Sequence, residues 1–458
     1  MGRILRIELR RSPAMLVALL SAVTGAGLLV SYPASFAGRW MQLAVATRLD
    51  LLVLLPLALA GGAWLGRRDA LHRVDELFAS TVRPRWQRVL PTAAAFGLAV
   101  VAAYLLVFLV GAAWVAPTAR YFPGAAVAVA AVGALSLVAA GWLGMAAGRA
   151  VPRLVTAPAL AVVGAAVAGM PALLPPSGSV VGTTTRAGSA VLLLTPIHDG
   201  NIDDFQTIVA RVTVPQALWL AALAVTGLLL LGVVSRRGIA LAVLPAVLGA
   251  VIAIPLLPAG GYPAAAAVDS AAGELVCDTG TPQVCLTRVH AYLRPDIAGP
   301  ARQAVTLLAA KLPGAPTRAV ESRQLHEWAR SGKDPVRAEP QAGTLVFDLA
   351  TLGITDPAEY AGADFLSFLL VAPWQPGCGA DAPDGSTFGA VAVAWLKNQP
   401  VDPQGLAEPA ERTRAQAAYR ALAGLPRAEQ GRRMARARDA ALGCRGDALL
   451  PILAEGTS

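Results

Sequence analysis

The residues that could carry out chemistry are scattered thinly through this 458-residue chain. His326 and Glu327 form an H-E pair, but Arg330 stands where a metalloprotease helix has its second histidine. His290 and Asp296 could join a serine in a hydrolytic triad, yet no G-x-S-x-G turn presents a nucleophile. The chain has four histidines in all, and the sequence favours no catalytic site and no enzyme activity.

Binding motifs for metals and nucleotides are also incomplete. Asp199, Asn201 and Asp203 have calcium-loop spacing, but Asp204 replaces the glycine at the sixth position and Ala210 the final glutamate. None of the three lysines follows a glycine-rich phosphate loop. The sequence therefore predicts no metal site and no cofactor in this chain, and any ATP with its Mg²⁺ would be bound by a partner subunit.

Composition places the chain in a membrane. It is 55% hydrophobic, with a mean hydropathy of +0.57. Up to Gly261 there are 19 arginines and 8 acidic residues, whereas the rest has 19 basic and 21 acidic residues. This basic excess belongs to the apolar half and indicates membrane topology, not nucleic-acid binding. The ratio of 35 arginines to 3 lysines, with abundant alanine, is typical of a GC-rich bacterial genome.

Seven apolar runs approach the roughly 20 residues that a helix needs to cross a bilayer. They make residues 13–261 a predicted transmembrane domain of about seven helices, near Met15–Tyr32, Leu49–Gly66, Leu90–Trp114, Gly124–Ala147, Leu154–Leu174, Pro215–Val234 and Ile239–Leu257. Arg48 and Asp50 are expected at the outer end of the second run, where they can pair or reach water. Frequent glycines predict close helix packing.

The arginine content of the connections between these runs predicts the direction in which each run crosses the membrane. One set of connections holds fourteen arginines and the opposite set five. By the positive-inside bias the amino end is cytoplasmic, and seven crossings leave the carboxyl end outside the cell membrane. Residues 1–12 read as an amphipathic helix whose arginines contact anionic lipid.

The basic segment 67–88 interrupts the apolar half and is predicted to be cytoplasmic. It resembles the coupling segment of ABC-2 type transporter permeases through Glu76, Leu77, Phe78, Ser80, Thr81, Pro84, Arg85 and Arg88. His72 and Arg73 replace the family's small residue, and the proline is displaced to Pro84. The likeness extends over about residues 1–234, in which the amino-terminal helix resembles the family's elbow helix.

The resemblance implies the membrane permease subunit of an exporter. Two such subunits, in a homodimer or a heterodimer, would each contact an ATPase subunit through the coupling segment. The residues implied in that contact are Glu76, Leu77, Phe78, Ser80, Thr81, Arg83, Arg85 and Trp86. The family typically has six spans, so a seventh span and a carboxyl-terminal domain are departures.

The region after the last run has a different composition. A linker over 262–273 leads to residues 274–458, which we predict to be a helix-rich α+β extracytoplasmic domain. Helices are expected over 300–312, 321–330, 356–371, 386–396, 408–422 and 427–442, and a strand over 343–349. The outer loop 175–214 is expected to form short surface helices over the fifth and sixth spans.

All four cysteines fall in this external region, which favours two disulfides. Of three connectivities we favour Cys277 with Cys285 and Cys378 with Cys444. A zinc site is disfavoured because the spacings are not C-x-x-C and no histidine is near. Two other functions remain open, namely a membrane-tethered extracytoplasmic enzyme of degenerate peptidase type and a sensor or scaffold.

Overall fold

The computed structural model describes residues 13–68, 86–173, 179–180, 183–184, 190–197, 202–233, 235–258, 264–325, 343–349, 363–375, 385–403 and 406–454. Among these, the chain forms two compact units. Unit 1 runs to Asp269, and unit 2 begins at Ser270.

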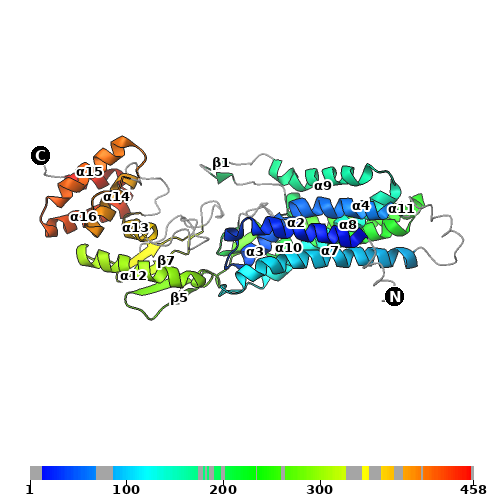
Figure 1. Ribbon diagram of the computed structural model, residues 1–458, viewed down its shortest axis with the longest axis horizontal. Helices are drawn as coiled ribbons and strands as arrows, with labels where there is room; N and C mark the ends of the chain where they lie inside the picture. The colour runs from blue at the N-terminus through cyan, green and yellow to red at the C-terminus, as the bar shows by residue number, and fades with distance from the viewer. Residues whose placement is uncertain are drawn as a thin grey trace. The chain divides into compact units, whose positions relative to one another are not determined.

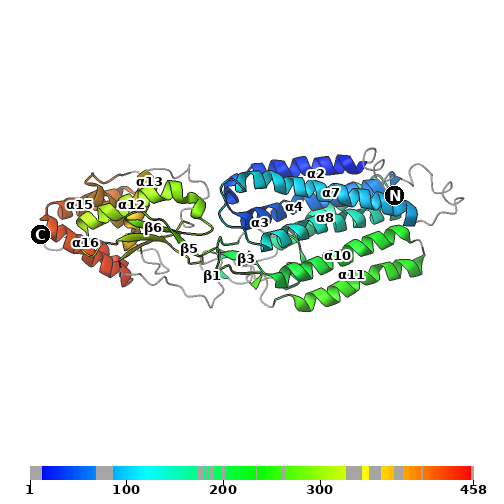
Figure 2. The same cartoon turned by 90° about the horizontal axis from the view of Figure 1, so that it is seen from below.

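Unit 1 is made of long apolar helices that lie alongside one another (Figures 1 and 2). They are α2 (Pro13–Val30), α3 (Trp40–Leu49), α4 (Leu51–Gly66), α7 (Trp86–Val115), α8 (Ala125–Ala150), α9 (Thr156–Leu173), α10 (Ala210–Gly232) and α11 (Arg236–Leu256). Apart from α3, which contains Gln42 and Arg48, their sequences are predominantly apolar, with no acidic residue in any first turn. A helix of this composition is suited to lipid or to a protein core, since it has no face that prefers water.

Five of these helices are long and apolar enough to cross a membrane: α2, α7, α8, α10 and α11. Helices α3 and α4 pass the same test as a pair bent by 47° at Asp50. The second span was expected to begin at Leu49, but the apolar helical path begins at Trp40. In α9 the apolar part of the described helix, residues 156–169, is shorter than the other spans.

Glycines bring α4 and α8 into backbone contact, as expected. A methyl group on Gly62 would lie 2.1 Å from the carbonyl oxygen of Gly141, and one on Gly144 would lie 2.1 Å from that of Leu59. Gly27 is different, because a methyl group there would have no neighbour within 4 Å. The α4–α8 contact therefore requires glycine, whereas the outer surface of α2 does not.

Short elements connect the helices of unit 1. They are η1 (Pro33–Ser35), η2 (Ala190–Leu194), the paired strands β1 (Ser179–Val180) and β2 (Thr183–Thr184), and the antiparallel strands β3 (Gln206–Ile208) and β4 (Ala266–Val268). In the described part of the loop expected to form short surface helices, η2 is a short helix, but its Leu193 and Leu194 are buried, at 1% and 7% exposure, and do not lie on the surface. The segment expected to be a linker contains strand β4. It is ordered as a strand because it pairs with β3.

Unit 2 contains a four-stranded sheet of order β5-β6-β7-β8. The strands are β5 (Leu275–Cys277), β6 (Gln283–Thr287), β7 (Arg318–Glu321) and β8 (Thr344–Phe347), and only the β5–β6 pair is antiparallel. Helix α12 (Arg294–Lys311) connects the parallel strands β6 and β7 as a crossover requires. A helix had been expected to begin at Glu321, which instead ends β7 because its neighbours Ala319 and Val320 pair with β8.

Helices pack around this sheet in unit 2 (Figure 1). After α12 they are α13 (Ala363–Val371), α14 (Gly385–Lys397), α15 (Pro409–Ala423), α16 (Arg427–Leu442) and α17 (Leu449–Ala454), with short turns η4 (Ala291–Leu293), η6 (Ala372–Trp374) and η7 (Gly446–Ala448). Their apolar faces and the sheet share one core, which includes Leu308, Phe347, Phe388 and Met434. The expected strand at β8 and the expected helices at α12, α14, α15 and α16 are confirmed. Glu408 and Glu411 form a capping box at the start of α15.

Candidate functional site

Buried polar side chains in unit 1 gather around the short helix α3. Arg39, Gln42, Arg48 and Asp50 on or beside α3 are each less than 10% exposed, and Gln216 of α10 is fully buried. Burial of a polar group in apolar surroundings is costly unless it is hydrogen-bonded. Such groups in a unit of apolar helices mark a candidate functional site.

Arg48 lies at the centre of this group and is 0% exposed. Its Nε donates to the carbonyl oxygen of Pro196, and its Nη2 donates to Oε1 of Gln216 at 2.8 Å. Of the two alternatives expected for Arg48, pairing or reaching water, the structure shows pairing, and the residue is fully buried. Its position inside the unit is possible because α3 continues the path of α4 and is itself buried from Met41 to Arg48.

Gln216 extends the same network to a segment far away in the sequence. Its Nε2 donates to the carbonyl oxygens of Leu193 at 2.6 Å and Thr195 at 2.9 Å. Together with the Arg48 contact, three main-chain carbonyls of the segment 193–196 are bound by side chains of α3 and α10. This arrangement attaches the segment 193–196, which lies between α9 and α10 in the sequence, to two helices of unit 1.

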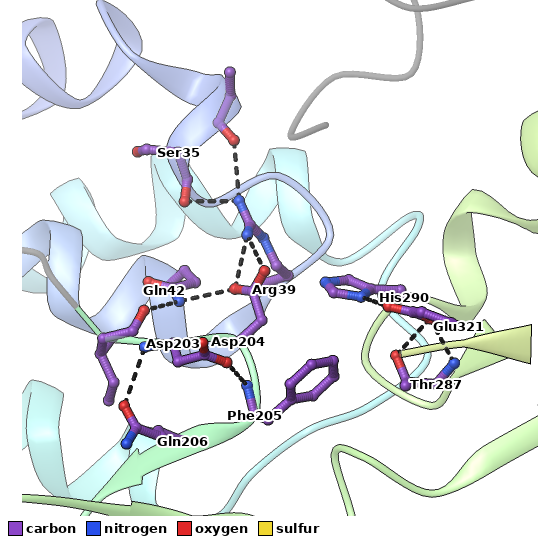
Figure 3. Close-up of polar contacts among 12 residues, drawn as sticks. Ser35, Arg39, Gln42, Asp203, Asp204, Phe205, Gln206, Thr287, His290 and Glu321 are labelled. Carbon is purple, nitrogen blue, oxygen red and sulfur yellow. Dashed lines mark hydrogen bonds and ion pairs between the residues drawn. The ribbon is translucent and has the colours of Figure 1, made fainter. Parts of the chain in front are cut away.

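A second polar contact attaches the following part of that loop (Figure 3). Nη1 of Arg39 contacts both carboxylate oxygens of Asp204, at 2.6 and 2.7 Å, in a pair that is almost fully buried. Nε2 of Gln42 donates to the same carboxylate and to the carbonyl oxygen of Ile202. Oδ1 of Asp203 accepts from the backbone N–H of Phe205 at 2.9 Å, and Asp199 and Asn201, which share its calcium-loop spacing, lie outside the described residues.

Asp50 stands at the bend between α3 and α4. Its Oδ1 accepts from the hydroxyl of Tyr32 at 2.6 Å, and this tyrosine follows the end of α2. Burial, reinforced by the hydrogen bond to Asp50, raises the pKa of Tyr32, so its hydroxyl stays protonated as a donor. The bond ties the end of α2 to the bend.

Unit 2 contains a separate buried polar cluster at the carboxyl ends of β6 and β7 (Figure 3). Oε2 of Glu321 accepts from the backbone N–H of Thr287 at 2.7 Å and from its hydroxyl at 2.9 Å. Oε1 of Glu321 contacts Nδ1 of His290, and both side chains are at most 3% exposed. A carboxylate that fixes an imidazole is an arrangement used by bases and metal ligands, but this imidazole is enclosed by protein.

The cysteine predictions are confirmed in part. Cys277 and Cys285 form a disulfide between opposite positions of β5 and β6. Cys444 is also disulfide-bonded, and its expected partner Cys378 lies outside the described residues. In the described part of the chain, no three residues among His, Cys, Asp and Glu are grouped as metal ligands.

The residues predicted to contact an ATPase lie outside the described residues, with one exception. Trp86 is the first residue of α7, whose backbone is described. The amphipathic segment 1–12 is also outside the described part. For the predicted coupling segment, the structure therefore describes the flanking helices, α4 before it and α7 after it.

Sequence reasoning missed the network of Arg48 and Gln216 and the His290–Glu321 pair. For Arg48 a signal existed, because an arginine inside an apolar run is costly and usually functional. Gln216 and Glu321 carried no such signal, since their partners lie 21 or more residues away in the sequence. Comparisons with protein-family models, with curated proteins and with solved structures found no match for this chain.

Proposed function

We propose that this chain is the membrane-spanning permease subunit of an ABC-type exporter. It would move a substrate across the cell membrane with ATP hydrolysed by a separate nucleotide-binding subunit. The observation that carries the proposal is the short basic segment 67–88, which connects two apolar helices and resembles a coupling segment. A permease driven by another subunit needs a cytoplasmic contact of this kind, because the chain has no nucleotide motif of its own.

The composition of unit 1 supports the proposal. Its long helices are predominantly apolar, and α2, α7, α8, α10 and α11 are each long and apolar enough to span a membrane. With the bent pair α3–α4 and with α9 they would make seven crossings. The segment 67–88 and unit 2 would then lie on opposite sides of the membrane, with the amino end inside.

The alternative of an extracytoplasmic enzyme gains less support. In the described part of unit 2, His290 with Glu321 comes nearest to a catalytic base, and His290 is only 3% exposed. A base must lie within hydrogen-bond reach of its substrate. An anchored enzyme would also need far fewer apolar helices than unit 1 contains.

The proposal is tested by charge reversal in the coupling segment. Arg83→Glu with Arg85→Glu should abolish co-purification of the ATPase subunit and partner-dependent ATP turnover, while the chain still inserts in the membrane. The matched control reverses Arg236 and Arg237, the first two residues of α11, which lie on the same predicted side. Unchanged turnover in the Arg83, Arg85 variant, or equal loss in the control, would contradict the coupling role.

A further inference from the structure

The segment 190–197, which contains η2, is seated inside unit 1. Leu193, Leu194 and Ile197 are 1%, 7% and 7% exposed. The two leucines share an apolar cluster with Met41 of α3 and Val129 of α8, and η2 also packs against α10 and α11. Residues from a connecting loop thus fill the space among four helices at one end of the unit.

Two buried side chains hold the main chain of this segment, and we call Arg48 and Gln216 the latch. The latch donates to the carbonyl oxygens of Leu193, Thr195 and Pro196. Its two members are joined to each other through Nη2 of Arg48 and Oε1 of Gln216. The hold is therefore polar and directional, although the surroundings are apolar.

The hydrogen bonds of this segment suit two positions better than any position between them. With the segment seated, the latch donates to three of its carbonyl oxygens. With the segment withdrawn, the same carbonyls and side chains would need water as their partner. A half-withdrawn state leaves buried carbonyls and a guanidinium without these bonds and is costly, which favours two discrete positions.

We propose that the segment 190–197 is a plug that closes the outer end of unit 1, and that the latch holds it in place. The plug must leave its seat for cargo to pass, so the latch sets how often this end opens. The link to cargo rests on the proposed function. The hold of the latch on the plug does not depend on it.

The test measures how accessible the plug is to water. Leu194→Cys is introduced into the full chain, which is purified in nanodiscs and treated with a water-soluble maleimide. Native background is measured on the wild-type chain, in which Cys277, Cys285 and Cys444 are disulfide-bonded. When Gln216→Leu is added to Leu194→Cys, the rate of labelling at Leu194→Cys should rise by at least about tenfold. The reason is that the seated position loses roughly one net buried hydrogen bond or more.

Three controls separate the latch from a general loosening of the fold. Leu137→Cys, 1% exposed in α8, should stay unlabelled, and Thr118→Cys, exposed between α7 and α8, should label rapidly in every background. Arg211→Gln, an exposed residue of α10, should leave the rate at Leu194→Cys unchanged. Gln216→Asn keeps the amide but shortens its reach and should give an intermediate rate.

The possible results are distinct. No increase with Gln216→Leu, or an increase that Leu137→Cys shares, would overturn the proposal. Two results together would support both the plug and the proposed function. Labelling of Leu194→Cys would rise with Gln216→Leu, and it would also rise in the chain with Arg48 and Gln216 intact when ATP, Mg²⁺ and the ATPase subunit are added. An increase with Gln216→Leu but no response to ATP would support the plug and count against ATP-driven export.

Discussion

In unit 1, Leu19, Leu109 and Leu241 each expose 60% or more of their surface, whereas in the described part of unit 2 Leu442, at 38%, is the single exposed large apolar side chain. Both units have apolar interiors, so the difference lies in their outer surfaces. An apolar exterior is stable in lipid, and a polar exterior is stable in water. The comparison indicates that the outer surface of unit 1 suits an apolar environment and that of unit 2 suits water.

Charged side chains also differ between the two units. In unit 2, Arg432 and Arg436 of α16 are exposed and lie beside Glu429. In unit 1, Arg39 and Arg48 are buried and bind parts of the loop between α9 and α10. Unit 2 buries a polar pair as well, His290 with Glu321, so the candidate functional side chains of both units lie in their interiors.

The largest expected effect contrasts an interior aromatic residue with a residue on the outer surface of a helix. Phe388→Ala should destabilise unit 2 by about 3–5 kcal/mol, because Phe388 is 1% exposed and packs on Trp374. Leu109→Ala, on the exposed side of α7, should change the stability of unit 1 by less than about 0.5 kcal/mol in a lipid environment. Thermal unfolding in nanodiscs measures both, and similar losses would argue against a lipid-facing surface at Leu109.

Removal of the β5–β6 disulfide comes next. The double change Cys277→Ser and Cys285→Ser should lower the stability of unit 2 by about 2–3 kcal/mol, as expected for a short closed loop. Unit 1 has no cysteine and should unfold as before. A change that appears instead in the unfolding of unit 1 would contradict the independence of the two units.

Glycine substitutions test the packing within unit 1. Gly144→Ala should cost about 1–3 kcal/mol, because its methyl group would overlap the carbonyl oxygen of Leu59. Gly27→Ala is the matched change at a helix position with no neighbour, and it should be neutral or stabilise by up to about 1 kcal/mol. Equal effects in thermal unfolding would mean that α4 and α8 are not in backbone contact.

The smallest effect is the pH dependence of a surface ion pair. Hydrogen bonds from Arg433 and Arg432 lower the pKa of Glu429 in the folded state. Its contribution to stability is therefore present above the ordinary glutamate pKa of about 4.3 and is lost as pH falls through the lower folded value. The difference in melting temperature between the wild type and Glu429→Gln should shrink over that range. A difference that stays constant with pH would show that the carboxylate charge contributes nothing.

Local patterns predicted the parts of the fold that depend on neighbours in the sequence. Apolar runs gave the long helices of unit 1, because a continuous run needs no distant partner to be recognised. Periodicity and capping residues likewise gave α15, which Glu408 begins, and α16 with its limits at Arg427 and Leu442. The disulfide of Cys277 and Cys285 followed from their separation of eight residues.

The missed features depend on contacts between distant segments. Glu321 was expected in a helix, but β7 is held by hydrogen bonds to β6 and β8, which no local pattern records. The buried position of η2 depends on hydrogen bonds from Gln216 and Arg48, whose partners are far away in the sequence. For the coupling segment, the prediction stays a prediction because its residues lie outside the described part of the chain.

In the proposed topology, unit 1 crosses the membrane with the segment 67–88 on one side and unit 2 on the other. Single-cysteine labelling of intact cells with a membrane-impermeant maleimide tests it most directly. We expect Thr118→Cys and Thr413→Cys, the latter exposed in α15, to label in intact cells, and Ser80→Cys to label only after permeabilisation. Labelling of Ser80→Cys in intact cells, or protection of Thr413→Cys, would contradict the account.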